Sequence, residues 1–318
     1  MMTAVTHLFL FIGSFALIWL AAGFLLGAID RVSRYFQKSG FIVAFLVLGL
    51  LTSLTEISVA LNSSWQEVPS VSAGNLASAS FVIFFLVIPI FAIVGNGIHL
   101  KGSINKKDLL LSLVVISLAP IVAMIGTMHR FYGFILIAAY AVLVYSISRD
   151  ASLAEHRHAI KKHLKKATLV RALFSLAIAA CIIFVASRFL VKEAVYFSEV
   201  LAIPSSLMGI LILSLGTNLP ELTIAIRAVL KHRKAIAFGD YIGSASLNTL
   251  ILGFLIVFNG PFVVHQQEFI ITAILMVLGM ILFWFFATSK YTISRLEGSI
   301  LLLVYIAFFV IELLAFAV

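Results

Sequence analysis

Continuous apolar runs of about 20 residues recur along the whole chain and limit its fold more than any other feature. A run of that length crosses the ~30 Å hydrocarbon layer of a bilayer as a helix. The runs do not alternate with polar residues, so they predict helices and not the strands of a barrel. We predict an all-α polytopic membrane protein with ten transmembrane helices near 8–28, 41–62, 70–95, 108–127, 131–148, 169–190, 198–229, 235–258, 268–288 and 296–317.

The composition agrees with a membrane protein. Of the 318 residues, 63% are hydrophobic and only 11% are charged, and the mean hydropathy is +1.17. Such values exclude an ordinary water-soluble globule. The formal net charge of +9 comes from lysines and arginines in the connections between apolar runs. The positions of these residues indicate the membrane topology of the chain. The basic charge therefore does not require a nucleic-acid partner, and we predict none.

The basic residues also predict the orientation of the chain. Most of the 22 lysines and arginines fall in every second connection, while Arg130, Arg188 and Lys192 fall on the opposite side. Short basic connections stay in the cytoplasm. We therefore predict a multi-pass protein of the cell membrane with both termini extracytoplasmic. The longest basic stretch includes RHAIKKHLKKATLVR at 157–171, and residues 149–168 are interpreted as a cytoplasmic linker.

The two halves of the chain repeat one another. When the chain is shifted by the 165 residues that separate Glu56 from Glu221, TSLTEISVAL at 52–61 falls on TNLPELTIAI at 217–226. At the same shift, GNLASAS at 74–80 falls on GDYIGSA at 239–245. Each half holds five predicted helices, an odd number, so the repeats have inverted topology. We assign 1–148 to the first repeat, with an ion motif at 51–83, and 169–318 to the second, with an ion motif at 216–248.

Polar residues interrupt the matching segments of the two repeats. In SLGTNLPELTIAIRAVL at 214–230, Asn218, Pro220 and Glu221 lie inside an otherwise apolar run. Proline removes a backbone donor, and a broken helix inside a membrane is tolerated only where it is buried or lines a cavity. Inverted repeats with broken helices at the midplane are typical of secondary transporters.

The paired glutamates predict a cation site. An ionised glutamate near the bilayer centre costs roughly 2.5 to 3.5 kcal/mol on insertion scales, and a bound cation offsets that cost. Thr52 and Thr217 each precede their glutamate by four residues, so on a helix the hydroxyl lies on the carboxylate's face. The pattern contains oxygen ligands and neither thiolate nor imidazole, which favours hard cations such as Ca²⁺ or Na⁺.

These residues resemble the calcium/cation antiporter superfamily, which includes the sodium/calcium exchangers. The family signature G-T-S-[LI]-P-E is similar to GTNLPE at 216–221, and the second signature, G-N-x-x-G-S-N, is similar to GDYIGSA at 239–245. The resemblance implies a secondary active antiporter that exchanges Ca²⁺ for Na⁺ by alternating access. It implies Glu56 and Glu221 as the central Ca²⁺ ligands, with further oxygens from Thr52, Ser53, Thr217, Asn218, Ser244 and Asn248.

Several positions depart from the family pattern. Asn218 replaces a serine, Thr55 replaces a proline, and Ala79 and Ile83 offer no side-chain oxygen where Ser244 and Asn248 do in the second half. We therefore expect an altered stoichiometry or a different coupling ion, and protons are the obvious substitute because burial disfavours an ionised carboxylate. Asp240 stands where the family has asparagine. It either contacts an ion directly or, as we favour, caps or partly solvates a helix.

Other functions remain open at this point. The chain could be an H⁺-coupled Ca²⁺/cation exchanger, a channel-like pathway, or a degenerate, non-transporting cation-binding protein. No nucleophile and base pattern or phosphate loop is present, so we predict no enzyme activity, no cofactor and no obligatory protein partner beyond the bilayer and the transported ions. Glu312 has no counterpart in the other half, and we expect it to snorkel or to lie near the outer interface.

Overall fold

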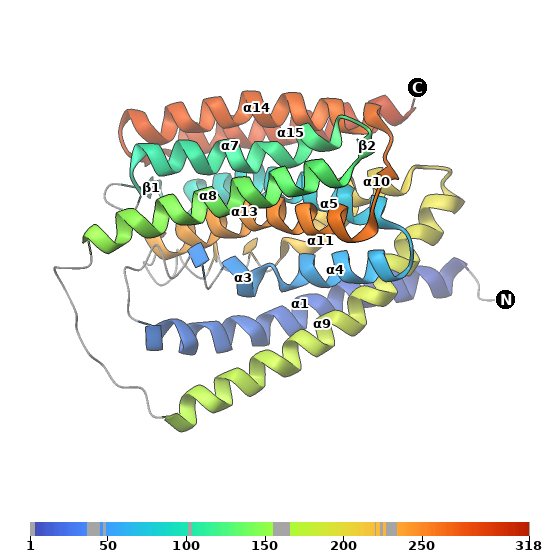
Figure 1. Cartoon of the computed structure of the whole chain (residues 1–318), viewed down its shortest axis with the longest axis horizontal. Coiled ribbons are helices and arrows are strands. Elements are labelled where there is room, and N and C mark those ends of the chain that lie inside the picture. The colour runs from blue at the N-terminus through green and yellow to red at the C-terminus, as the bar shows by residue number, and fades with distance from the viewer. Residues whose placement is uncertain are drawn as a thin grey trace.

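The structure is a computed structural model of the chain. It describes residues 4–36, 45–46, 49–100, 104–154, 166–219, 221–222, 225–226 and 234–317. Long helices lie side by side along the longest axis of the molecule (Figure 1). The regular elements of this part of the chain are helices, apart from four strands of two residues each. The prediction of an all-helical membrane protein is thereby confirmed at the level of fold class.

Seven helical segments of the described chain are long and apolar enough to cross a membrane. They lie in α1 (Ala4–Phe36), in the continuous run of α5 (Pro69–Val82), η2 (Ile83–Val87) and α6 (Ile88–Val94), and in α8 (Arg130–Ala154), α9 (Lys166–Val200), α13 (Lys234–Asn259), α14 (Gln266–Ser289) and α15 (Arg295–Ala317). The other helices are α3 (Gly49–Thr52), α4 (Leu54–Trp65), α7 (Lys106–Ala123), α10 (Ser205–Met208), η4 (Gly209–Leu213) and α11 (Ser214–Thr217).

The predicted boundary between the spans 169–190 and 198–229 is wrong. Helix α9 continues to Val200, and the chain then turns through Ala202, whose φ is 54°. Pro204 is the N-cap of α10, with an extended ψ of 142°. No charged residue marks this turn after Glu199, so hydropathy alone could not locate it.

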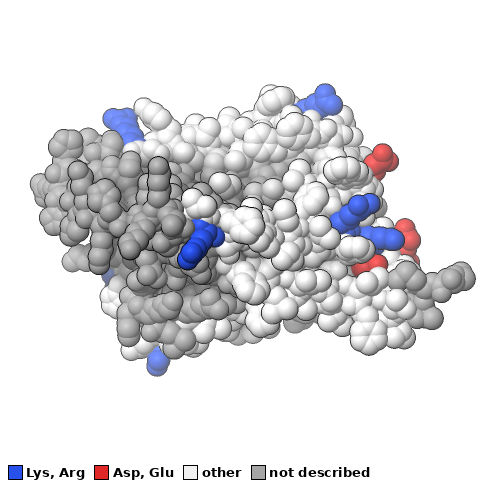
Figure 2. All heavy atoms as spheres, turned by 90° about the horizontal axis from the view of Figure 1, so that it is seen from below, with Lys and Arg blue, Asp and Glu red and all other residues white. Residues whose placement is uncertain are grey.

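Helix α13 lies in the centre of the molecule and packs against α3, α5, α7 and α8. Helices α1 and α9 pack on each other at one edge, and α14 and α15 lie at the opposite edge (Figure 1). The core between α5, α14 and α15 is aromatic, with Phe81 against Phe308 and Phe84 against Phe283. Outward-facing positions carry exposed apolar side chains such as Phe9, Leu278 and Leu303, the surface expected against lipid. Figure 2 shows a broad uncharged band across the middle of one face.

Two short antiparallel ladders join connections that are far apart in the sequence. β1 (Ile98–His99) pairs with β4 (Thr292–Ile293), and β2 (Thr127–Met128) pairs with β3 (Phe262–Val263). Each ladder therefore links a connection of the first half to a connection of the second half.

The helices that carry the ion motifs approach neighbouring backbone very closely. A Cβ on Gly74 of α5 would overlap the backbone oxygen of Ser206 in α10, and one on Gly243 of α13 would overlap the backbone oxygen of Phe45. Only glycine permits backbones to come this near. These two approaches bring α5 and α13 against the broken helices described next.

Candidate cation-binding site

Every site residue predicted from the sequence lies in the described part of the chain and is buried. None is more than 1% exposed. The residues come from three places, namely the two helix breaks and the face of α13 that carries positions 240, 244 and 248. Pro220, which the sequence marked as a helix breaker, lies outside the described residues.

The two helix breaks stand at matching positions. Helix α3 ends at Thr52, and Ser53 interrupts the helix with φ −74° and ψ 9° before α4 begins. Helix α11 ends at Thr217, and Asn218 has φ −90° and ψ 6°. Both interrupting residues are near the sparsely populated bridge region, where many active-site residues are found.

Thr55 joins the first break to the second. Its hydroxyl donates to Glu56 Oε2 at 2.5 Å and also lies 3.4 Å from the backbone oxygen of Thr217. From the sequence, Thr55 was identified only as a departure from the proline of the family pattern, and this contact was not predicted. Because this hydroxyl fixes one oxygen of Glu56, the other carboxylate oxygen is left for a different partner.

Ser244 joins α13 to both breaks. Its hydroxyl lies 2.9 Å from Ser53 Oγ and donates to Glu221 Oε1 at 3.3 Å. Tyr241, on the same helix, lies with its hydroxyl 3.5 Å from the backbone oxygen of Glu221. Glu221, Ser53 and Ser244 therefore form one connected set of oxygens.

Asp240 is neither a helix cap nor partly solvated. It lies inside α13, which begins at Lys234, and it is only 1% exposed. Thr52 donates its hydroxyl to Asp240 Oδ1 at 3.2 Å. The favoured capping interpretation is therefore wrong, because this residue faces the first helix break and not solvent.

Ser80 supplies an oxygen that the sequence analysis missed. It is buried on α5, donates to the backbone oxygen of Ala245 at 3.0 Å and lies 3.4 Å from Asn248 Nδ2. The repeat gave no signal for it, because the matching position in the second half is Ala245, which has no side-chain oxygen. Ala79 of α5 and Ile83, the first residue of η2, are fully buried and bring no side-chain oxygen.

Five buried oxygens of the predicted site residues have no hydrogen-bond partner among the described residues. They are Glu56 Oε1, Glu221 Oε2, Asn218 Oδ1, Asn248 Oδ1 and Asp240 Oδ2. An acceptor buried without a donor is costly, and native interiors rarely keep one without a reason. All five atoms are hard oxygen donors of the kind that Ca²⁺ and Na⁺ coordinate. Their chemistry fits a cation.

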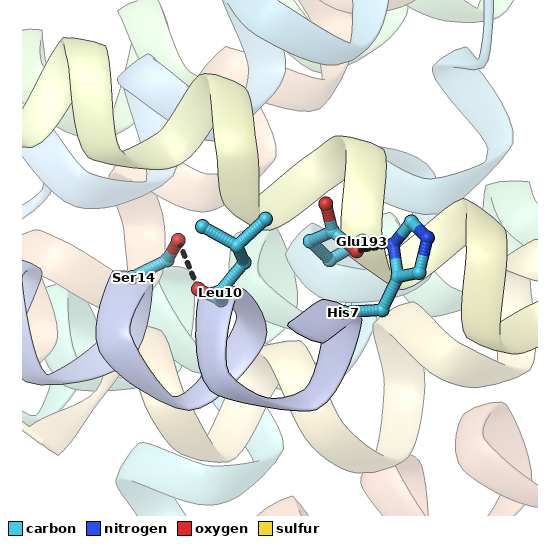
Figure 3. A network of polar contacts seen from close by, with 4 residues as sticks. All are labelled: His7, Leu10, Ser14 and Glu193. Atoms are coloured by element: carbon cyan, nitrogen blue, oxygen red, sulfur yellow. Dashed lines mark hydrogen bonds and ion pairs between the residues drawn. The ribbon is translucent and has the colours of Figure 1, made fainter. Parts of the chain in front are cut away.

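The charges in this region have the same sign. Glu221 has two charged neighbours, Glu56 and Asp240, and both are carboxylates. The ion pair found among the described residues joins His7 of α1 to Glu193 of α9 (Figure 3). It does not involve the three carboxylates. No three acidic, histidine or cysteine side chains of the described residues converge on one point, so neutral oxygens must complete any coordination shell.

Glu312 does not snorkel to solvent, and its expected place near the outer interface stays a prediction. It is 2% exposed and accepts a hydrogen bond from Thr272 of α14 at 2.9 Å. Glu268 of the same helix is its charged neighbour and accepts a hydrogen bond from Ser206. The hydrogen bond from Thr272 was not predicted, because hydropathy does not report the partner that an adjacent helix provides.

Comparisons with known proteins give consistent matches. A model of the sodium/calcium exchanger protein family matches residues 6–148 and 171–314. The sodium/calcium exchanger MaX1 of Methanosarcina acetivorans is 33% identical over 140 residues, which is 44% of this chain and 40% of that protein. An uncharacterised membrane protein of Methanocaldococcus jannaschii is 25% identical over 89% of this chain and 90% of its own length.

The fold also matches a solved structure. The sodium-calcium exchanger NCX_Mj superposes with a TM-score of 0.70 at 20% identity, covering 96% of this chain and 98% of the other. Identity at that level supports the shared fold alone.

Proposed function

The chain belongs to the sodium/calcium exchanger protein family, and we propose that it is a secondary active antiporter that exchanges Ca²⁺ for Na⁺ by alternating access. The observation that carries this proposal is the set of buried carboxylate and amide oxygens without hydrogen-bond partners among the described residues. In this proposal the chain is a transporter without a catalytic residue or cofactor, and the ions are its substrates.

Glu56 and Glu221 are proposed as the central Ca²⁺ ligands. Each has one oxygen held by a hydroxyl group and one left for the ion. Oxygens from Thr52, Ser53, Thr217, Asn218, Ser244 and Asn248 complete the shell, since Ca²⁺ takes 6 to 8 oxygen ligands. Two carboxylates and one divalent ion are also neutral together.

Neutralisation gives a physical reason for obligatory exchange. When no ion is bound, the site holds carboxylates of like charge in a dry interior. Movement of helices past these uncompensated charges is unfavourable. Ca²⁺ or Na⁺ removes that penalty. Helices α1 and α9 pack on each other, and we propose that they move together past the core that holds the glutamates.

We further propose ten membrane passes arranged as two inverted repeats, 1–148 and 169–318, joined by the basic linker 149–168. Helix α3 at 49–52 and α11 at 214–217 support this arrangement because they differ by the same 165 positions as Glu56 and Glu221. Strands β2 and β4, which belong to different ladders, also differ by 165 positions. We propose a cell-membrane location with both termini extracytoplasmic.

A proton-coupled exchanger is the second candidate. Ala79 and Ile83 leave the α5 side of the site without two oxygens that flanking Na⁺ ions could use. A channel or a degenerate cation-binding protein would use the same glutamates without coupled exchange.

The test is ⁴⁵Ca²⁺ uptake into proteoliposomes with outward Na⁺, H⁺ and K⁺ gradients imposed one at a time. We expect uptake driven by Na⁺ that Glu221→Gln abolishes. Uptake driven only by H⁺ would transfer the coupling to protons, and uptake without any counter-gradient would favour a channel. Binding of Ca²⁺ without uptake under any gradient would favour the non-transporting protein.

A further inference from the structure

Asp240 lies beside the proposed Ca²⁺ site, one helical turn along α13 from Ser244, and it contacts Thr52, one of the proposed ligands. Residues four apart share a face of a helix and rise by about 6 Å, so Asp240 and Ser244 face the helix breaks at different levels. Ser244 contacts Ser53 and Glu221, whereas Asp240 contacts Thr52. The two levels can therefore hold two different ions.

The opposite half of the molecule has a matching contact with one chemical difference. Thr52 donates to Asp240 Oδ1 at 3.2 Å, and Thr217 donates to Asn75 Oδ1 at 3.2 Å. The exposed fraction is 1% for Asp240 and 0% for Asn75. In each side chain the second terminal atom, Oδ2 of Asp240 or Nδ2 of Asn75, has no hydrogen-bond partner among the described residues. That atom is an acceptor oxygen in Asp240 and an N–H donor in Asn75.

The difference decides where a cation can bind. A carboxylate oxygen attracts a cation, whereas the N–H groups of an amide present positive hydrogens and repel it. The Asp240 side of the site therefore carries a negative charge that attracts a cation, and the Asn75 side carries none.

The number of buried charges indicates which cation. Glu56, Glu221 and Asp240 carry three negative charges when all are ionised, and Ca²⁺ neutralises only two. A single uncompensated charge in a low-dielectric interior is costly. The ion pair recorded in the described chain, between His7 and Glu193, does not involve these residues. One monovalent cation at Asp240 completes the neutralisation.

We propose that Asp240 forms a second subsite for a monovalent metal cation that binds together with Ca²⁺, and that the hydroxyl of Thr52 is shared between this subsite and the Ca²⁺ shell. This inference rests on the proposed Ca²⁺ site at Glu56 and Glu221. The occluded complex then holds one Ca²⁺ and one monovalent ion. Occupation of the two levels is cooperative, because each ion lowers the negative charge that the other leaves uncompensated.

The test is Ca²⁺ binding to the purified full-length protein in lipid nanodiscs, by isothermal titration calorimetry at fixed pH. Ionic strength is held constant with N-methyl-glucamine, which is too large for a buried site, while Na⁺ is raised from zero. For the wild type we expect the Ca²⁺ Kd to fall about tenfold at low Na⁺, a coupling of ordinary size. The Kd then rises as Na⁺ competes at the glutamates. For Asp240→Asn, which keeps the shape of the side chain, Na⁺ should only compete.

The outcomes separate this inference from the proposed function. A wild-type Kd that rises from the lowest Na⁺ concentration overturns the subsite but leaves the Ca²⁺ site intact, whereas absence of Ca²⁺ binding at any Na⁺ concentration overturns both. If Asp240→Asn does not fold, the wild-type curve decides alone.

The titrations are repeated in two buffers of different ionisation enthalpy. Proton uptake on Ca²⁺ binding to the wild type at low Na⁺, lost in Asp240→Asn, would show that a proton and not Na⁺ joins Ca²⁺ at Asp240, and would overturn the metal subsite.

Discussion

At the scale of single residues, hydroxyl groups decide which carboxylate oxygens remain for an ion. Thr55 and Ser244 each hold one oxygen of a glutamate, and the second oxygen of each glutamate has no partner among the described residues. The identity of both glutamates followed from the repeat in the sequence. The role of Thr55 did not, because it depends on a contact across the two breaks that no local pattern encodes.

Ser244→Ala should weaken Ca²⁺ binding. The substitution removes the hydroxyl that donates to Glu221 and contacts Ser53, and hydrogen bonds to charged groups contribute about 1.5–3 kcal/mol. We expect the Ca²⁺ Kd, measured by calorimetry, to rise at least about tenfold. Ser246→Ala is the matched control, because that buried hydroxyl bonds only the backbone of its own helix at Ile242. Equal effects of the two variants would refute the assigned role of Ser244.

Thr272→Val should lower stability without changing ion preference. The buried carboxyl of Glu312 would lose its recorded donor, at a cost of about 1–3 kcal/mol. The readout is thermal unfolding in detergent, together with Ca²⁺ binding. Thr288→Val on the same helix is the control, since its hydroxyl bonds the backbone of Trp284. An unchanged melting temperature for Thr272→Val would show that this hydrogen bond is not important for stability.

At the scale of elements, the sequence predicted helices more securely than their ends and their contacts. The spans predicted at 235–258 and 296–317 correspond closely to α13 and α15, because charged residues flank their N-terminal ends. The end of α9 was missed, since the turn after it is uncharged. Nor could the sequence locate the π-helical segments η2 and η4, whose wider turns depend on packing.

Gly74→Ala should separate α5 from α10. The new Cβ would overlap the backbone oxygen of Ser206, and overpacking of this kind costs about 1–3 kcal/mol or more. We expect a lower melting temperature and weaker Ca²⁺ binding, because α5 also carries Asn75 and Ser80. Gly13→Ala is the control, since nothing lies within 4 Å of its Cβ position. If the two variants melted alike, the close approach would not be required.

At the scale of the whole molecule, α1 and α9 form a pair that packs on the helices at the two breaks, α9 on α4 and α1 on α3 and α11. His7 Nδ1 lies 2.6 Å from Glu193 Oε2, which holds the two helices together at one end (Figure 3). Phe15 of α1 fills the space beside Gly216 of α11, so that a Cβ on Gly216 would overlap its ring. This second contact joins the pair to the ion motif.

Cross-linking should distinguish movement within the pair from movement of the pair. In a Cys181→Ser background, we expect a short thiol cross-link between His7→Cys and Glu193→Cys to leave most ⁴⁵Ca²⁺ exchange intact. A cross-link between Phe15→Cys and Gly216→Cys should reduce exchange to background, and a reductant should restore it. Each single cysteine variant is assayed as the control. Retained exchange with the second cross-link in place would exclude movement of α1 past α11.

The two ladders and the interleaved helices have a consequence for how such a molecule could be made. Helices of one half pack extensively on helices of the other, as in α1 with α9, α13 with α8 and α14 with α7, and β1–β4 and β2–β3 each pair one half with the other. Neither half can bury its apolar faces alone. Two separately translated polypeptides, 1–154 and 166–318, should therefore find each other in the bilayer and assemble into one exchanger. Two half-length genes that arose by duplication therefore need not be fused into one gene to produce a working heterodimer.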